Sequence, residues 1–265
     1  MPNVRVGDIN MYYEIHGKGE PLVMICGAGA SVEWSLAQIP IYSHAYQLVL
    51  FDNRGAGKSD KPDIPYTTEM MADDLAGLLD IIGIKSAHIS GVSMGGMIAQ
   101  QFALRYPKRV ISLILKCTYC GGPRSILPDE TMRISMGPKM APEELARKMI
   151  DLTMTQEFID KNPGLVQQIM SMMTNQLAPP IGMMRQGQAV KSHNTYERLP
   201  GIKAPTLIIS GDADRALPVE NSRIIAARIP GAELVILKNA GHLLIEAGDE
   251  PNRIMLDFLK RHRAK

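Results

Sequence analysis

Long apolar runs, cysteine and net charge are all scarce in this chain of 265 residues. No apolar run approaches the roughly 18 residues that a membrane-spanning helix needs, and the N-terminal stretch lacks the apolar segment of a signal peptide. The three cysteines, Cys26, Cys117 and Cys120, are too few for a disulfide framework and fit a reducing compartment. The formal net charge of +2 favours neither a nucleic acid nor a membrane surface as a partner. We therefore expect a cytoplasmic globular protein.

Two short motifs suggest a metal or a nucleotide, but neither has the context that it needs. Residues 117–120 (CTYC) are formally C-x-x-C, yet there is no second pair and no neighbouring histidine, so we expect no metal. Residues 55–59 (GAGKS) look like the end of a phosphate-binding loop. That motif needs a glycine where Asp52 stands, and the proline-rich residues 60–65 cannot begin the helix that should follow. We expect no nucleotide and no cofactor.

The apolar residues occur mostly in short continuous runs, which are typical of strands buried on both faces of a parallel sheet. Segments with helical periodicity separate these runs. After an edge strand at Asn10–Ile15, the predicted strands are Pro21–Gly27, Tyr46–Asp52, Ser86–Gly91, Val110–Cys117, Pro205–Gly211 and Ala232–Lys238. The predicted helices are Thr67–Ile82, Gly95–Tyr106, Val219–Ile229 and Glu250–Arg261. This alternation predicts an α/β fold with a doubly wound, mostly parallel sheet.

One long segment, Arg124–Tyr196, interrupts the alternation with helix-like stretches and prolines and is too long for a loop in a compact domain. We predict a helical cap at residues 124–196, inserted between a first core part (1–123) and a second core part (197–265). Ten of the 18 methionines lie in this insertion: Met132, Met136, Met140, Met149, Met154, Met170, Met172, Met173, Met183 and Met184. Methionine fills helical cores, and it also suits a pliable roof over a substrate pocket. We expect some of these methionines, with Trp34, to line an apolar cleft.

A G-x-S-x-G motif, Gly91-Val92-Ser93-Met94-Gly95, follows a predicted strand and opens a predicted helix. This context is typical of a nucleophile elbow, in which a strained turn projects the serine hydroxyl above the sheet. The flanking glycines remove Cβ atoms that would clash with the neighbouring strand and helix. The N–H of Met94, at the start of the helix, would point at negative charge that develops on a substrate oxygen. Ser93 is the candidate nucleophile.

A serine nucleophile needs a base, and the base needs an orienting acid. Elbow-type hydrolases have the chain order Ser, Asp or Glu, His. Of the six histidines, His242 lies in the loop after the last predicted strand, where the base belongs. The loop after the preceding strand offers two carboxylates, Asp212 and Asp214. We favour Asp214, which lies farther out on the loop.

Together these stretches resemble the α/β-hydrolase superfamily over nearly the full length outside the insertion. The matching stretches are residues 27–29 (GAG), residues 52–59 (DNRGAGKS), residues 91–96 (GVSMGG), residues 211–218 (GDADRALP) and Gly241-His242. The subgroup that the chain is most similar to includes small esterases, enol-lactone hydrolases, cofactor-free haloperoxidase-like perhydrolases and meta-cleavage C–C hydrolases. The resemblance makes residues 52–59 a structural loop beneath the active site, shaped by Arg54 and the glycines.

The resemblance also implies roles for individual residues. It assigns Ser93 as nucleophile, Asp214 as orienting acid and His242 as base, and it places the oxyanion hole at the N–H groups of Ala28 and Met94. The substrate contacts that it implies are Gly27, Trp34, Leu217 and Leu243. The family usually has His-Gly where this chain has Cys26-Gly27, which leaves the hydrogen bonding of the oxyanion loop open.

The resulting expectation is a serine hydrolase that cleaves a small, mainly apolar ester or lactone through an acyl-enzyme on Ser93. The first alternative is a C–C hydrolase of the meta-cleavage type, although that family tends to carry tryptophan where Leu243 follows His242. The second is a ligand-sensing protein with slow turnover. A haloalkane dehalogenase is disfavoured because it needs a carboxylate at the position of Ser93. We expect a monomer or homodimer whose partner is the small-molecule substrate.

Overall fold

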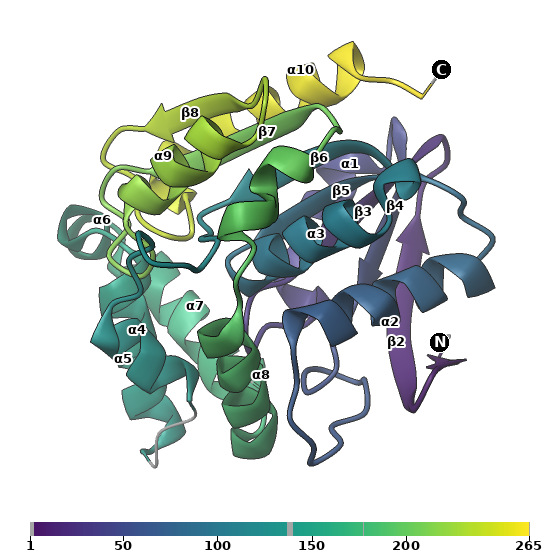
Figure 1. Ribbon diagram of the computed structural model, residues 1–265. Coiled ribbons are helices and arrows are strands. Elements are labelled where there is room, and N and C mark those ends of the chain that lie inside the picture. The colour runs from purple at the N-terminus through teal and green to yellow at the C-terminus, as the bar shows by residue number, and fades with distance from the viewer. Residues whose placement is uncertain (1–2, 137–139, 177, 265) are drawn as a thin grey trace.

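The computed structural model describes residues 3–136, 140–176 and 178–264, and its centre is an 8-stranded sheet (Figure 1). The strands are β1 (Asn3–Val6), β2 (Ile9–His16), β3 (Glu20–Ile25), β4 (Tyr46–Phe51), β5 (Ala87–Val92), β6 (Val110–Lys116), β7 (Thr206–Gly211) and β8 (Glu233–Leu237). Their order across the sheet is β1-β2-β4-β3-β5-β6-β7-β8. The pairs β1–β2 and β2–β4 are antiparallel, and every later pair in this order is parallel. The predicted doubly wound, mostly parallel sheet is confirmed.

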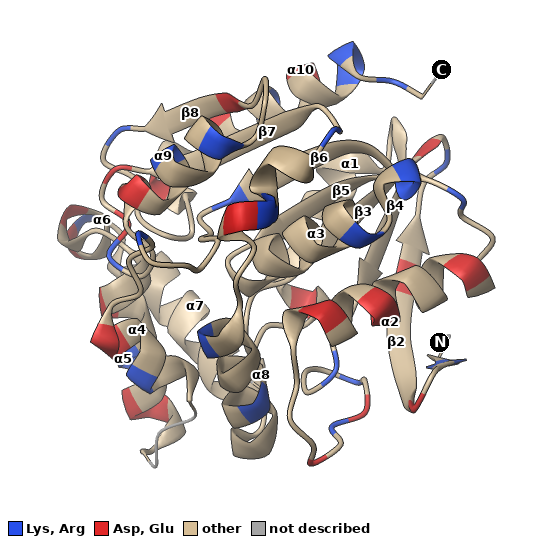
Figure 2. Cartoon of the chain, viewed as in Figure 1, with Lys and Arg blue, Asp and Glu red and all other residues tan. Residues whose placement is uncertain are grey.

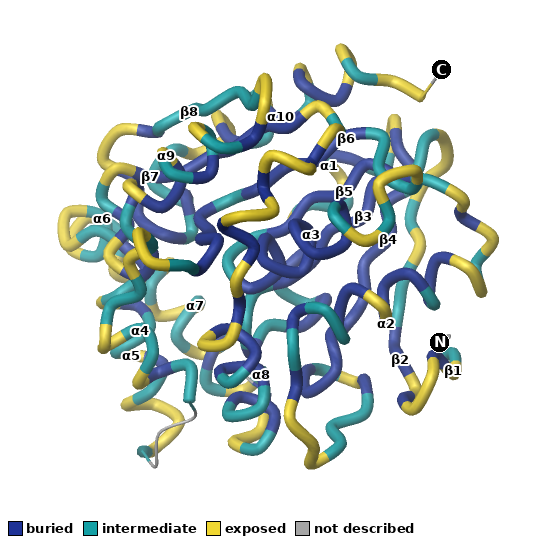
Figure 3. The backbone as a smooth tube through the Cα atoms, viewed as in Figure 1, coloured by how far each residue is buried: buried dark blue, intermediate teal, exposed yellow. Residues whose placement is uncertain are grey.

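Helices cover both faces of this sheet. The α-helices are α1 (Ile39–Tyr42), α2 (Thr68–Ile81), α3 (Met94–Arg105), α4 (Asp129–Ser135), α5 (Pro142–Thr153), α6 (Gln156–Lys161), α7 (Pro163–Gln176), α8 (Pro180–Ser192), α9 (Val219–Arg228) and α10 (Glu250–Arg261). Short 3-10 helices are η1 (Val32–Gln38), η2 (Pro107–Arg109), η3 (Tyr196–Gly201) and η4 (Ile245–Ala247). Figure 3 shows that α3 and the central strands are the most buried part of the molecule.

Alternate side chains of each central strand enter two different cores. Val23 and Ile25 of β3 pack with α2, α3 and α9, whereas Leu22 and Met24 pack with α1 and α10. Successive side chains of a strand point to opposite faces, so a strand with helices on both sides must be apolar throughout. This is why continuous apolar runs predicted these strands. The edge strand β1 was not predicted, because in its sequence NVRV only Val6 is buried.

In the chain, helices α4 to α8 all come after β6 and before β7. In space they gather at one side of the molecule (Figure 1). Residues of α5 and α7, together with Met154, form a small apolar core of their own, which contains Ala146, Ile150 and Met173. Trp34 and Leu243 from the sheet-bearing part of the chain pack against that core. The helical insertion therefore has its own packing and also rests on loops from the carboxyl ends of the strands.

The loop that resembles a phosphate-binding motif is closed by its own hydrogen bonds. The Asp52 carboxylate accepts from the N–H groups of Val32 and Lys58, both at 2.7 Å. A Cβ at Gly57, whose φ is +51°, would lie 2.0 Å from the same carboxylate. Arg54 is buried in an ion pair with Asp74. The loop is thus filled by a carboxylate that would repel phosphate, and its role is structural.

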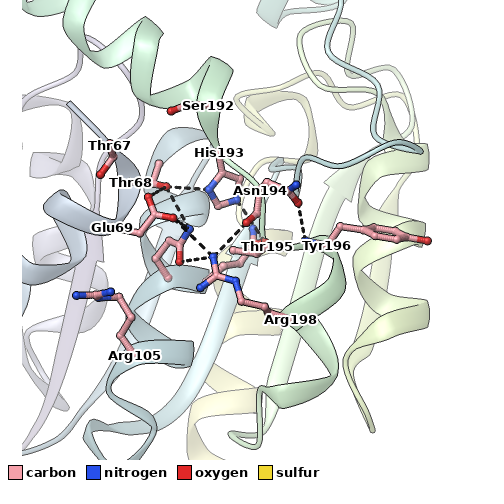
Figure 4. A network of polar contacts seen from close by, with 12 residues as sticks. Thr67, Thr68, Glu69, Arg105, Ser192, His193, Asn194, Thr195, Tyr196 and Arg198 are labelled. Carbon is pink, nitrogen blue, oxygen red and sulfur yellow. Dashed lines mark hydrogen bonds and ion pairs between the residues drawn. The ribbon is translucent and has the colours of Figure 1, made fainter. Parts of the chain in front are cut away.

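A buried polar network ties the end of α8 to helices α2 and α3 (Figure 4). Thr68 Oγ1 lies 2.9 Å from His193 Nδ1, and Thr195 Oγ1 donates to Gln100 Oε1 at 2.6 Å. Burial, and then the charge of Arg198, lowers the pKa of His193 to about 3, so this ring is neutral. The network fixes the point where the helical insertion returns to the core.

Charged residues of both signs are interspersed along the helices and loops (Figure 2). Within the described ranges, no helix is both long enough and apolar enough to cross a membrane.

Candidate active site

Ser93 lies in a strained turn between β5 and α3, with φ 55° and ψ −122°. Positive φ is costly for a residue with a side chain and persists only where the surroundings enforce it. Here the close approach of neighbouring backbone enforces it. A Cβ at Gly91 would lie 2.1 Å from the Gly95 oxygen, and a Cβ at Gly95 would lie 2.1 Å from the Ile25 oxygen. Both outer positions of the motif therefore require glycine.

Hydrogen bonds to the next strand hold the turn in place. The Ser93 N–H donates to the Lys116 oxygen at 3.0 Å, and the Thr118 hydroxyl donates to the Ser93 oxygen at 2.7 Å. Gly96 packs directly on Thr118, since a Cβ there would lie 2.6 Å from the threonine Cβ. The turn is therefore braced from the end of β6, and the Ser93 side chain is left at the surface of a cavity.

Asp214 and His242 form a buried hydrogen-bonded pair. His242 Nδ1 lies 2.8 Å from Asp214 Oδ2, and the two residues are 7% and 5% exposed respectively. The other carboxylate oxygen of Asp214 accepts from the Leu217 N–H at 2.8 Å. Because Nδ1 faces the acid, Nε2 is the nitrogen left for proton transfer. Asp212 is exposed instead and accepts from the Asn239 N–H.

A cavity of about 580 Å³ brings Ser93 and His242 together with three of the four predicted substrate contacts, Gly27, Trp34 and Leu243. Leu217 does not line this cavity in the described part of the chain; its side chain is buried in the core, and its N–H holds Asp214. Gly27 lies next to Ser93, since a Cβ there would lie 3.3 Å from the Ser93 Cβ.

Part of the cavity is lined by the helical insertion. Four of its methionines line the cavity: Met149, Met172, Met173 and Met183. Trp34 also lines it, and its indole Nε1 is buried with no hydrogen-bond partner among the described residues. The sequence predicted methionines and Trp34 in an apolar cleft, but it gave no means of choosing these four from the ten.

Two backbone N–H groups beside Ser93 are available to an oxyanion. Within the described residues, neither the Ala28 N–H nor the Met94 N–H is donated to another atom of the chain. Ala28 lines the cavity, and Met94 is the first residue of α3. A helix N-terminus with a free N–H favours negative charge.

Hydrogen bonds brace the loop from Cys26 to Gly29, the candidate oxyanion loop, in which Cys26 stands at the position where the family usually has histidine. The buried Cys26 thiol lies 3.4 Å from the Ser31 oxygen. The main support comes from α8, where Gln186 Oε1 accepts from the Gly29 N–H at 2.7 Å and Gln186 Nε2 donates to the Arg54 oxygen at 2.8 Å. Gln186 is fully buried. Sequence reasoning missed it, because a glutamine among helical polar residues carries no signal of a contact 157 residues away.

The helical insertion also touches His242, the candidate base, directly. The Thr153 oxygen, at the end of α5, accepts from the His242 N–H at 2.8 Å. A Cβ at Gly241 would lie 2.5 Å from the same oxygen, so the glycine before His242 permits this approach. Sequence reasoning missed Thr153 for the same reason as Gln186: the contact joins distant segments through a backbone atom.

One group of side chains has metal-ligand chemistry. The ligand atoms of Cys117, Asp214 and His242 all lie within 4.8 Å of one another, and all three residues are buried. Burial, and then the Asp214 carboxylate, raises the pKa of the Cys117 thiol well above its ordinary value, so the thiolate that a metal needs is disfavoured. The 2.8 Å contact between Asp214 and His242 is a hydrogen bond. The arrangement suits an orienting acid and a base.

Comparison with known proteins identifies the family. A sequence model of the alpha/beta hydrolase fold family matches residues 20–249. The chain belongs to this family. It is an alpha/beta hydrolase, and Ser93, Asp214 and His242 all follow strands of its own sheet.

Three similar proteins illustrate the range of chemistry in the family. A 2-hydroxy-6-oxononadienedioate/2-hydroxy-6-oxononatrienedioate hydrolase from Burkholderia vietnamiensis is 31% identical, over 96% of this chain and 92% of its own. The enol-lactonase from Burkholderia xenovorans has a TM-score of 0.86 and 26% identity, over 98% of this chain and 100% of its own. A thermophilic esterase from Thermogutta terrifontis has a TM-score of 0.85 and 27% identity, over 98% of this chain and 97% of its own. Each is a relative by fold and sequence.

Proposed function

We propose that this alpha/beta hydrolase cleaves small, mainly apolar carboxylic esters or lactones through an acyl-enzyme on Ser93. The observation that carries the proposal is the cavity that presents the strained Ser93 and His242 to one ligand, with His242 bonded to the buried Asp214 at 2.8 Å. The similarity to an enol-lactonase and to an esterase supports the same reaction class.

In the proposed reaction, Ser93 Oγ attacks the carbonyl carbon while its proton passes to His242 Nε2. The N–H groups of Ala28 and Met94 stabilise the oxyanion, and each such donor contributes about 3–4 kcal/mol to the transition state. The C–O bond then breaks, and His242 donates the proton to the leaving oxygen. Water attacks the acyl-enzyme with His242 as base, which restores Ser93 and releases the acid. Asp214 holds the His242 tautomer throughout.

Helices α4 to α8 act in this proposal as a cap over the acyl group. Their cavity-lining methionines are flexible and apolar, so they suit acyl groups of different shape. We expect the enzyme to work in the cytoplasm without a metal or cofactor.

The test is labelling with an active-site serine phosphonate, followed by kinetics on p-nitrophenyl esters of increasing acyl length. The parent protein should label on Ser93 and hydrolyse short and medium esters. Ser93→Ala should fold normally and fail to label. Its activity should fall to the low residual rate that substrate binding and the oxyanion hole still provide. Hydrolysis by Ser93→Ala at the parent's rate would remove Ser93 as nucleophile.

C–C bond hydrolysis is the second candidate, because a relative of 31% identity has a name that describes a hydrolase of a 2-hydroxy-6-oxo dienedioate. Leu243, in place of the tryptophan typical of that subgroup, argues against it. Turnover of a 2-hydroxy-6-oxo dienoate that exceeds turnover of every ester would favour this candidate. Tight ligand binding with negligible multiple turnover of either class would instead indicate a ligand-sensing protein.

A further inference from the structure

The cavity contains a lysine that the proposed reaction does not use. Lys116, the last residue of β6, lines the same cavity as Ser93 and is paired with Val92 in the sheet. Paired residues of parallel strands point to the same face, and so do residues two apart on one strand. The Lys116 side chain therefore lies on the side of Val92 and Ser90, toward α1 and α10.

No anion among the described residues neutralises this lysine. Its ammonium makes neither a hydrogen bond nor an ion pair with them, and its electrostatic neighbours are the thiols of Cys26 and Cys117. Burial raises the pKa of Cys26 to about 11 and that of Cys117 well above its ordinary value, so both thiols are neutral. Asp249 also lines the cavity, but it is exposed and makes no ion pair with Lys116. Burial accordingly lowers the pKa of Lys116.

A second polar group of this cavity also lacks a partner. Ser90 is 1% exposed and lines the cavity, and its hydroxyl oxygen has no hydrogen-bond partner in the described part of the chain. Buried hydroxyls are nearly always hydrogen-bonded, and a partly buried cation without a counter-ion is also costly. Ser90 and Lys116 project from neighbouring strands into one cavity, so a single ligand can satisfy both. An ammonium and a hydroxyl donor are the pair of groups that suits a carboxylate.

We propose that Lys116 and Ser90 form a subsite for a carboxylate, so that the preferred substrates are esters or lactones carrying a free carboxylate on a short apolar chain. The inference rests on the proposed ester chemistry at Ser93 and adds the substrate class. Lys116 lies beside the nucleophile, since its oxygen accepts from the Ser93 N–H at 3.0 Å. A short diacid monoester can therefore place its ester carbonyl at Ser93 and its carboxylate at Lys116. The apolar cap then receives the remaining group.

The test compares monomethyl glutarate, which carries one carboxylate, with neutral dimethyl glutarate. In the parent, kcat/KM should be higher for the monoester. Lys116→Met keeps the length of the side chain and removes the charge. It should lower the ratio of kcat/KM for monoester over diester about 10- to 100-fold, the worth of a charge-assisted hydrogen bond. Lys116→Arg should preserve most of the ratio. Lys108→Met, a change at an exposed lysine, serves as the matched control and should leave the ratio at the parent value.

A binding measurement separates this inference from the proposed function. Monomethyl glutarate is titrated calorimetrically into Ser93→Ala with and without Lys116→Met. Weaker binding in the double variant supports the subsite even if the parent hydrolyses neither ester. That combined result would refute the ester chemistry and leave the carboxylate subsite supported. If the parent hydrolyses both esters and Lys116→Met leaves their ratio and the affinity unchanged, the carboxylate subsite is refuted and the ester chemistry stands.

Discussion

Replacing Gln186 tests whether the cap holds the oxyanion loop in its active shape. The side chain is fully buried and joins α8 to two backbone groups, the Gly29 N–H and the Arg54 oxygen. Gln186→Met keeps the size of the side chain and removes both hydrogen bonds. Each buried backbone group left without a partner costs about 1–3 kcal/mol, so we expect the free energy of unfolding to fall by about 2–6 kcal/mol.

A loss of activity should accompany this loss of stability. Gly29 follows Ala28, whose N–H is a proposed oxyanion donor, so freeing the Gly29 N–H lets that donor move. The complete loss of one oxyanion donor lowers kcat about 100- to 1000-fold, which sets the upper limit. We expect kcat of Gln186→Met to fall by about 10-fold or more with little change in KM, because the interaction is made in the transition state.

The assay is ester kinetics well below the melting temperature, alongside urea unfolding. Gln186→Glu separates the two contacts, because it keeps an acceptor for the Gly29 N–H and loses the donor to the Arg54 oxygen. It should lose stability, yet it should keep more of kcat than Gln186→Met does. Gln188→Met, a change at a partly exposed position of the same helix, should alter unfolding by less than about 0.5 kcal/mol. A folded Gln186→Met enzyme with the parent kcat would refute the reasoning.

Three further predictions concern the acid, the pH dependence and the cap. Asp214→Asn should lower kcat by several orders of magnitude, whereas Asp212→Asn should have a mild effect; p-nitrophenyl ester kinetics distinguish them, and the reverse order would exchange their roles. Burial holds the pKa of His193 at about 3, below the value of about 6.5 in an unfolded chain, so the unfolded state binds the extra proton. The free energy of unfolding should therefore fall as pH drops below about 6.5, by up to about 1.4 kcal/mol per pH unit. Urea unfolding at several pH values should show a weaker pH dependence of this free energy in His193→Gln than in the parent. Met172→Ala should shift acyl-length preference more than the melting temperature, whereas the buried Met154→Ala should cost about 2–5 kcal/mol and leave the preference unchanged. If both variants lose stability and neither changes its acyl-length preference, the cap methionines serve packing alone.

The sequence by itself was sufficient to predict the fold class, because the signals for it are local. Strands buried on both faces must be continuously apolar, and the runs at β3 to β7 met that requirement within a few residues of their bounds. The elbow is equally local, since the glycines that Ser93 needs lie two positions away on either side. The chain order of elbow-type hydrolases then indicated His242 as the candidate base and reduced the candidate acids to Asp212 and Asp214.

Tertiary structure decided the features that depend on contacts between distant segments. Which carboxylate meets His242 is a matter of distance, and the fold buries Asp214 against the ring while Asp212 faces solvent. Gln186 of α8 accepts from the Gly29 N–H in the candidate oxyanion loop, a contact that no spacing in the sequence encodes. Lys116 reads in the sequence as the polar end of an apolar strand. Only the sheet register and the cavity show that it points inward without a partner, because burial and pairing are properties of the packed molecule and not of the residue.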